Sequence, residues 1–239
     1  ERSRIGEERF RREHECEFLI FDETLISSLT LADMEGVAPV ETTGQVRWFK
    51  RPTPGHTYMV SLDPSMGTGG DFSAIQIFEL PTFEQIGEWQ HNMTPMNQQV
   101  RILQGINKHI HDSIVEKDAS ATPQIFYSME NNTIGEAALM RVMDIGEENI
   151  MGMFLSEPIR KGHRRKFRRG FNTTAKFKID ACTKFKELVE SGKMKLNSQL
   201  LISELKDFVA TGLSYKAKPG QHDDLVSACL LMTRMMKVL

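Results

Sequence analysis

Several features that would assign this 239-residue chain to a protein class are missing from its sequence. The three cysteines lie far apart and form no CxxC pair, which argues against a zinc site or a disulfide framework and is typical of a reducing compartment. No apolar run approaches the ~20 residues that span a bilayer, and no signal peptide is present. No GxxxxGK(S/T) phosphate loop occurs, so this stretch carries no P-loop ATPase.

A strong net charge is missing too. The formal charge is −2, and the hydrophobic share of 40% and charged share of 26% are ordinary for a globular protein. Any signal for nucleic-acid binding must therefore be local. The length suits one large domain, or one domain with an appendage.

The start of the chain differs from the rest. It begins at Glu1 in a charged, helix-like stretch, which indicates a piece of a longer protein. Residues 41–56 hold two prolines and two glycines, a composition typical of a linker or of a lead-in to a first strand. We expect residues 1–55 to be a linker and residues 56–239 to form the folded domain.

Hydrophobic periodicity predicts an α/β fold. The expected strands are residues 57–63, 73–78, 85–89 and 124–130, with a short strand at 151–155. The expected helices are residues 94–116, 133–143, 173–190, 199–210 and 223 to the end. Three strands in quick succession predict an antiparallel meander, and a crossover helix then adds parallel strands. This is the order of the ribonuclease H-like mixed sheet flanked by helices.

Acidic residues stand at the ends of three of these elements. Asp63 closes the first core strand, beside a glycine-rich turn, and Glu130 closes a later apolar strand. The pair Asp223 and Asp224 opens the last helix. Each has an ordinary explanation on its own, because Asp before Pro starts turns, strand ends are solvated and acids stabilise helix N-termini.

Taken together, the acids indicate a metal site. The predicted topology brings Asp63, Glu130, Asp223 and Asp224 to one edge of the sheet, where they repel one another unless a cation neutralises them. Two divalent ions roughly 4 Å apart are suited to phosphodiester hydrolysis, and hard oxygen ligands favour Mg²⁺ or Mn²⁺. Asp71, just past the glycine-rich turn, is predicted as an accessory ligand.

A basic tract supplies the local charge that the whole chain lacks. Residues 160–169 hold seven lysines and arginines: Arg160, Lys161, Arg164, Arg165, Lys166, Arg168 and Arg169. Binding to the phosphate backbone of DNA is the favoured interpretation, because it would offset repulsion between DNA and an acidic site. A solvated charge run or a targeting signal remains the alternative.

Three segments together resemble one family. Residues Ser61–Asp71, Ser128–Asn132 and Gly220–Leu225 are similar to the nuclease domain of the large terminase of tailed bacteriophages, of the T-even type. The resemblance covers essentially the whole chain. Glu1–Gly6 and Phe10–Glu13 resemble the end of the family's ATPase domain or its linker.

The resemblance implies a function and its partners. The full protein would be an ATP-driven motor that packages viral DNA, and ATP would bind only in the missing upstream domain. The expected partners are double-stranded DNA, the portal protein and the small terminase subunit, in the host cytoplasm on the procapsid. The family's catalytic acids carry over to Asp63, Glu130, Asp223 and Asp224, with Asp223 preferred over Asp224 as the principal ligand.

Two other readings of the residues stay open. A Holliday-junction resolvase or a ribonuclease H would use the same carboxylates on the same fold. A non-catalytic module for DNA translocation or portal docking would use them only as structural groups. The basic tract and the long C-terminal helices favour the terminase.

Overall fold

The computed structural model describes residues 23–158 and 169–239. Within them, a seven-stranded mixed sheet runs in the order β1-β2-β5-β4-β3-β6-β7. Strands β3, β4 and β5 form an antiparallel meander, and β6 and β7 extend it in parallel with β3. This confirms the predicted mixed sheet. The bounds are Glu41–Thr43 (β1), Val46–Trp48 (β2), Thr57–Asp63 (β3), Ser73–Leu80 (β4), Glu84–His91 (β5), Gln124–Met129 (β6) and Met153–Phe154 (β7).

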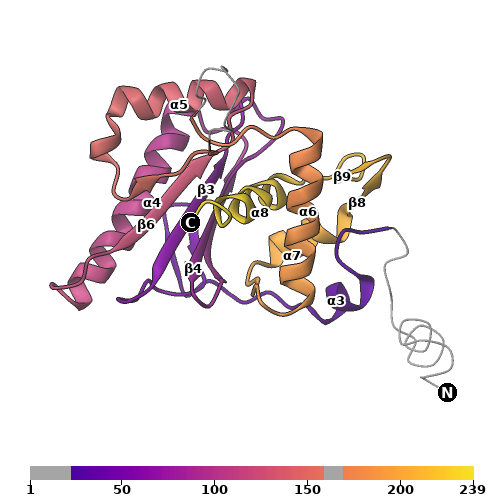
Figure 1. The fold of residues 1–239 in the computed structure, drawn as a ribbon, viewed down its shortest axis with the longest axis horizontal. Helices are drawn as coiled ribbons and strands as arrows, with labels where there is room; N and C mark the ends of the chain where they lie inside the picture. Colours follow the sequence, from indigo (N-terminus) through magenta and orange to yellow (C-terminus); the bar gives the residue numbers. More distant parts are fainter. Residues whose placement is uncertain (1–22, 159–168) are drawn as a thin grey trace.

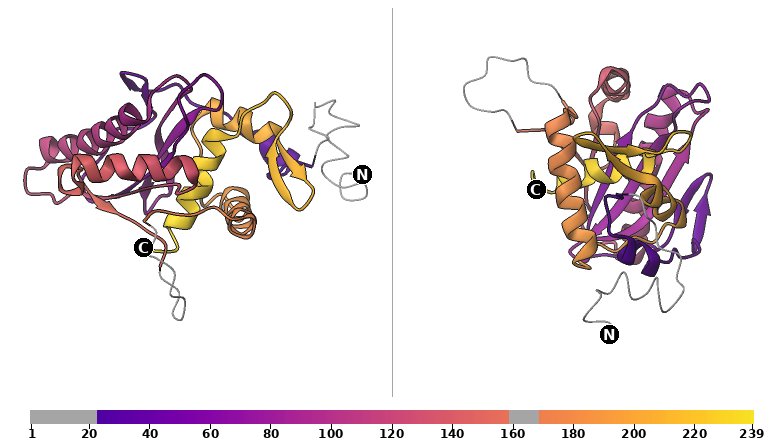
Figure 2. Two further views of the ribbon diagram at one scale, coloured as in Figure 1. Left: turned by 90° about the horizontal axis from the view of Figure 1, so that it is seen from above. Right: turned by 90° about the vertical axis from the view of Figure 1, so that its right-hand side faces the viewer.

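Helices cover both faces of the sheet (Figure 1). On one face lie α4 (Met96–Lys117) and α5 (Thr133–Ile145). On the other lie α6 (Ala175–Glu190), α7 (Gln199–Asp207) and α8 (Asp224–Met235). The view from above in Figure 2 shows the sheet between these two groups. Nearly every residue of α8 is buried, because it packs on β3 and β4 and is covered in turn by α6 and α7.

The alternation along β3 decides which side chains face which helices. Tyr58, Val60 and Leu62 belong to the core beneath α4 and α5. Met59 belongs to the core beneath α8, and the Ser61 hydroxyl donates to the carbonyl of Ala228 in α8 at 2.8 Å. Successive side chains on a strand point to opposite faces. Asp63 therefore emerges on the same face as Met59 and Ser61, which is the face covered by α8.

Two segments differ from the sequence-based expectation. Part of the expected linker forms the β1–β2 hairpin, which joins the edge of the main sheet through β5, and its Val46 and Trp48 are buried. The expected helix 199–210 stops at Asp207. Residues 208–217 instead form a hairpin of β8 (Phe208–Thr211) and β9 (Ser214–Ala217). Gly212 in the connecting turn adopts the positive φ of 60° that such a tight turn requires.

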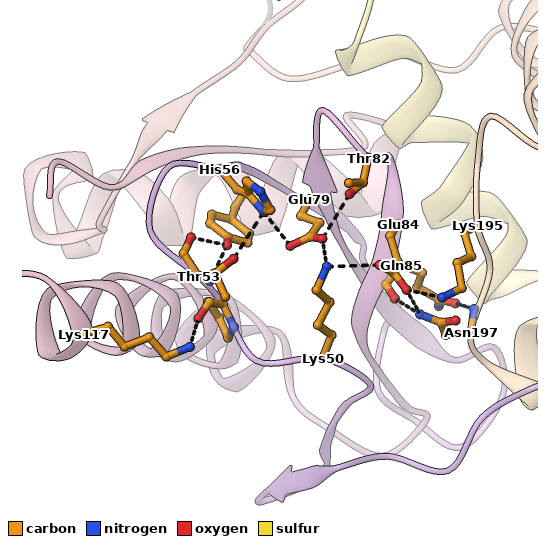
Figure 3. Close-up of polar contacts among 12 residues, drawn as sticks. Lys50, Thr53, His56, Glu79, Thr82, Glu84, Gln85, Lys117, Lys195 and Asn197 are labelled. Atoms are coloured by element: carbon orange, nitrogen blue, oxygen red, sulfur yellow. Dashed lines mark hydrogen bonds and ion pairs between the residues drawn. The ribbon is translucent and has the colours of Figure 1, made fainter.

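A polar network fixes the end of β3 that lies opposite Asp63 (Figure 3). The buried carboxylate of Glu79 on β4 accepts hydrogen bonds from Lys50 and from Thr82 at 3.0 Å, and lies 3.1 Å from His56 Nδ1. Lys50 also donates to Glu84 of β5 at 3.2 Å. The chain that leads into β3 is therefore held to the sheet by charged hydrogen bonds.

Within residues 23–158 and 169–239, no helix combines the length and apolar content needed to cross a membrane. Cys182 and Cys229, the cysteines in these ranges, are buried and unpaired.

Candidate active site

Asp63 and Glu130 project from adjacent strand ends. Leu62 and Met129 are partners in the parallel register of β3 and β6, and the backbone N–H of Glu130 donates to the carbonyl of Leu62 at 3.1 Å. Both acids emerge on the α8 face, close enough for the charge of Glu130 to raise the pKa of Asp63. The predicted meeting of these two acids is therefore present in the structure.

Small residues let α8 approach these strand ends closely. Ser61 and Ser128 are cross-strand partners on the same face, and each hydroxyl is used locally. Ser61 bonds α8 at Ala228, while Ser128 donates to the carbonyl of Leu155 at 2.8 Å. With α8 lying across β3 and β4, its first turn carries Asp223 and Asp224 towards the same edge as Asp63.

The side chains of Asp223 and Asp224 do not cap α8. Asp223 occupies the N-cap position but makes no side-chain capping hydrogen bond. The N–H groups of Leu225 and Val226 instead donate to Glu204 of α7, the latter at 3.1 Å. Because Glu204 satisfies these helix-terminal donors, helix capping does not explain why two acids stand here.

Asp223 and Asp224 have different surroundings. Asp223 Oδ2 accepts the N–H of Ala217 at 3.2 Å and lies 3.9 Å from Lys178 Nζ. Asp224 accepts the N–H of Phe72, but its buried Oδ2 has no hydrogen-bond partner in the described part of the chain. His222 Nδ1 lies 3.6 Å from that oxygen, beyond hydrogen-bond distance. The unsatisfied oxygen therefore belongs to Asp224, although the sequence favoured Asp223 as the ligand.

The acids raise one another's pKa. Burial, followed by the negative charges of Glu130, Asp224 and Asp223, holds the pKa of Asp63 well above its usual range. Burial also raises the pKa of Asp224 to about 6, and the charges of Asp223 and Asp71 add to the rise. A cluster of this kind favours protons or a metal cation as its neutralising partner.

Asp71 lies at the margin of the cluster. It is exposed, and it follows the glycine-rich turn that begins after Asp63. Its charge contributes to the raised pKa of Asp224, which places it within electrostatic reach of the acids. The turn itself is held against the start of α4, where Gly67 approaches the carbonyl of Thr94 too closely for any Cβ atom.

The donor set fits a hard divalent cation in its chemistry. Carboxylates from two strands and one helix supply oxygen ligands, and the buried Asp224 Oδ2 lacks any other partner. In the described ranges, however, no three acidic, histidine or cysteine side chains already surround a common point as metal ligands do. The acids are gathered at one edge of the sheet.

A cleft of about 150 Å³ opens beside Asp63 and Glu130, with residues of α6 and α8 forming its other walls. Two cations on these walls, Lys178 and Arg234, were not singled out from the sequence. Neither follows a motif, and their positions depend on how α6 packs against α8. Leu230, Leu231 and Ala181 give the cleft an apolar lining between the charges.

Arg234 joins the chain on both sides of the basic tract to α8. It donates to Glu157, to Thr173 Oγ1 at 3.0 Å and to the carbonyl of Asn172 at 3.1 Å. Its guanidinium also lies 5.2 Å from the ring centroid of Phe171. A buried arginine with this many partners has a structural role.

The structure describes only the last residue of the predicted basic tract. Arg169 pairs with Glu147 and lies 5.2 Å from the ring centroid of Phe154, so its guanidinium is already engaged by protein groups. The other tract residues lie outside the described ranges: Arg160, Lys161, Arg164, Arg165, Lys166 and Arg168.

Comparison with known families identifies the family of this chain. The model of the terminase RNaseH-like domain matches residues 60–235. The chain belongs to this family. The resemblance to large terminase nucleases is therefore confirmed at the level of the family, while the T-even type stays a prediction.

Solved structures of terminase nucleases share the fold. The large terminase nuclease from thermophilic phage G20c with bound magnesium is 18% identical, with a TM-score of 0.64, and the match covers 90% of this chain and 97% of that one. The Thermus phage P74-26 large terminase nuclease domain is 18% identical, with a TM-score of 0.59 and coverage of 84% and 90%. The human cytomegalovirus terminase nuclease domain, Mn soaked and inhibitor bound, is 13% identical, with a TM-score of 0.51 and coverage of 88% and 93%.

Proposed function

We propose that this domain is the metal-dependent endonuclease of a viral DNA-packaging motor. It cuts concatemeric double-stranded DNA when packaging of a genome starts and when it ends. One observation carries the proposal. Asp63 and Glu130 stand on adjacent parallel strands and face the start of α8, where Asp224 keeps a buried oxygen without a hydrogen-bond partner in the described part of the chain.

In this proposal Asp63, Glu130 and Asp224 bind Mg²⁺, and Mn²⁺ can replace it. Asp223 and Asp71 lie further out and complete the negative charge around the site. The related nuclease from phage G20c, described with bound magnesium and with bound cobalt, supports a divalent requirement. When bound, a pair of divalent ions supplies positive charge at the attacking and leaving oxygens of a phosphodiester.

The protein's own groups position the substrate. By holding the metal at the strand ends, the carboxylates of Asp63 and Glu130 would position the scissile phosphodiester. The apolar lining of the cleft would limit the access of bulk water. The basic tract holds the DNA backbone against repulsion by the acids. Its proposed contacts to DNA phosphates come from Arg160, Lys161, Arg164, Arg165, Lys166 and Arg168, while Arg169 pairs with Glu147 at the end of the tract.

The biological setting follows from the family. We place the domain in the host cytoplasm on the procapsid, as part of a larger protein whose upstream domain hydrolyses ATP. The portal protein and the small terminase subunit would be its protein partners. These assignments rest on family membership and not on any surface of this chain.

Cleavage of supercoiled plasmid in Mg²⁺ tests the proposal. The unchanged protein should nick and linearise the plasmid. Asp63→Ala should reduce the rate by more than about 100-fold, because it removes a metal ligand and loss of even an outer-shell partner costs about 10–100-fold. Asp180→Ala is a matched control, since Asp180 is an exposed acid on α6 and its loss should leave the rate unchanged.

The other outcomes separate the alternatives. Equal cutting by the unchanged protein and Asp63→Ala would overturn the catalytic assignment. No cutting by any variant would favour a docking module whose acids are structural. Preference for a four-way junction, or for an RNA–DNA hybrid, over linear duplex would indicate a resolvase or a ribonuclease H.

The salt dependence of binding tests the basic tract. Replacing Arg164, Arg165 and Arg168 by glutamine should weaken duplex binding. It should also flatten the plot of log K against log salt concentration by about 0.9 for each phosphate that the protein no longer neutralises. An unchanged slope would show that these arginines do not bind phosphates.

A further inference from the structure

Lys178 differs from the other cation on the cleft wall. Arg234 is 7% exposed, and Glu157, Thr173 and Asn172 take up its guanidinium hydrogens. The Lys178 side chain is 26% exposed, and its ammonium makes no hydrogen bond within residues 23–158 and 169–239. Its nearest acid is Asp223, at 3.9 Å, which is beyond hydrogen-bond distance.

A contact with an aromatic ring keeps the Lys178 ammonium near the cleft. The ammonium lies 5.4 Å from the ring centroid of Phe208, at the start of the β8–β9 hairpin. A cation over an aromatic face is weakly attracted, so this contact holds the lysine at the cleft without using its N–H donors. From here the ammonium faces the same cleft as Asp63 and Glu130.

The charges of the acidic cluster beside the cleft leave a role for one more cation. Asp63, Glu130, Asp223 and Asp224 contribute four negative charges when ionised. Two divalent ions would cancel these four charges. The phosphodiester of the substrate then brings one further negative charge, and the ammonium of Lys178 is the group on the described walls of the cleft that can balance it.

We infer that Lys178 is a catalytic residue that leaves Asp223 and binds a non-bridging oxygen of the scissile phosphate of DNA. This inference rests on the proposed nuclease function and names a substrate contact for it. The lysine forms no covalent bond and transfers no proton. It stabilises the negative charge that grows on the phosphate oxygens during hydrolysis.

Two substitutions test the ammonium separately from the side-chain stem. Lys178→Met keeps an unbranched stem and removes the charge, whereas Lys178→Arg keeps the charge. Lys176→Met is the matched control, because Lys176 is exposed on the same helix two residues earlier and therefore on a different side. Thermal unfolding identifies any misfolded variant, and Lys178→Gln replaces Lys178→Met if the latter fails to fold.

The first readout is binding of a short DNA duplex in Ca²⁺, under conditions where no cutting is detected. Lys178→Met should flatten the plot of log K against log salt concentration by about 0.9, the value for one neutralised phosphate. Lys178→Arg and Lys176→Met should keep the original slope. An unchanged slope for Lys178→Met would overturn the proposed bond to phosphate.

The second readout is the single-turnover cleavage rate in Mg²⁺ at saturating DNA. Lys178→Met should lower this rate by about 100-fold, as does removal of one donor to a developing oxyanion, and Lys178→Arg should restore most of it. A slower rate that excess Mg²⁺ restores would mean that Lys178 acts on the metal ligands, and would also overturn the inference. If the unchanged protein cuts no DNA, the nuclease proposal fails, while the slope in Ca²⁺ still decides whether Lys178 binds phosphate.

Discussion

The carboxyl group of Glu204 on α7 accepts the backbone N–H of Val226 on α8 at 3.1 Å. It is also held by the side-chain amide of Gln90 on β5, at 2.9 Å. Through these two bonds the end of the sheet, α7 and the first turn of α8 are joined at one half-buried acid. Because Glu204 accepts the helix-terminal N–H groups, the carboxylates of Asp223 and Asp224 are not needed as caps and can belong to the acidic cluster.

Removing the Glu204 carboxyl group should destabilise the start of α8. Glu204→Ala leaves two helix-terminal N–H groups without an acceptor, and we expect it to lower the free energy of unfolding by about 1–2 kcal/mol. Glu204→Gln keeps an acceptor oxygen and should cost less than half as much. Urea denaturation measures both, with Ser203→Ala on the exposed face of α7 as the control. Equal losses for Ala and Gln would contradict the capping role.

The stability of the metal-free protein should fall as pH rises from about 4 to about 8. The folded-state pKa is about 6 for Asp224 and about 8 for Glu204, and burial is the main cause of both rises. The unfolded values are roughly 3.9 and 4.3, so over this window the folded state holds protons that the unfolded state has released. The contribution of these two acids to the free energy of unfolding is thus fully present below about pH 4. It is lost as the pH rises through their folded-state pKa values.

Thermal unfolding in EDTA and in Mg²⁺ checks this dependence. The rise in Tm produced by Mg²⁺ should be larger at pH 8 than at pH 5, because the carboxylates must lose their protons to bind a cation. Asp224→Asn should flatten the pH dependence in EDTA, and Asp180→Asn should not. A Mg²⁺ effect of equal size at both pH values would contradict the prediction.

Neutralising Asp63 should make the metal-free protein more stable. The ionised form of this acid is disfavoured by burial and by the nearby charges of Glu130, Asp224 and Asp223, and Asp63→Asn removes its share of that repulsion. At pH 8 in EDTA we expect a gain of about 1 kcal/mol, seen as a rise in Tm of about 2–4 °C. The same variant should lose the stabilisation by Mg²⁺. A lower Tm in EDTA would show that Asp63 is held by favourable contacts instead.

Local patterns in the sequence predicted the elements that carry the acids. The alternation from Tyr58 to Leu62 defines β3, and the apolar run that ends at Met129 defines β6, so Asp63 and Glu130 could be assigned to neighbouring strand ends. The broad apolar arc after Asp224 predicted a buried last helix. These inferences succeed because they depend on neighbours within the same element.

Contacts between distant segments could not be predicted from the sequence. Glu204 caps α8, and Lys178 approaches Asp223, because of how three helices pack on the sheet. No spacing in the sequence encodes that packing. The β1–β2 hairpin was mistaken for a linker because its strands have three residues each, too few for alternation to stand out from their proline- and glycine-rich surroundings. The choice between Asp223 and Asp224 likewise depends on the tertiary neighbours of each carboxylate.

The glycine-rich turn after Asp63 offers a test with an internal control. Gly67 has a φ of +68°, and a Cβ atom there would lie 2.1 Å from the carbonyl oxygen of Thr94. Gly67→Ala must therefore move the turn away from the start of α4, and we expect it to lower the free energy of unfolding by about 1–3 kcal/mol.

Gly70, three residues further along, has no atom within 4 Å of a built Cβ and no left-handed φ. Gly70→Ala should therefore change stability by no more than about 0.5 kcal/mol. Because the turn follows directly from Asp63, Gly67→Ala should also reduce plasmid cutting in Mg²⁺ at a temperature where the variant is still folded. Matching stability and cutting rates for the two variants would show that the close approach of Gly67 to Thr94 does not position the acid.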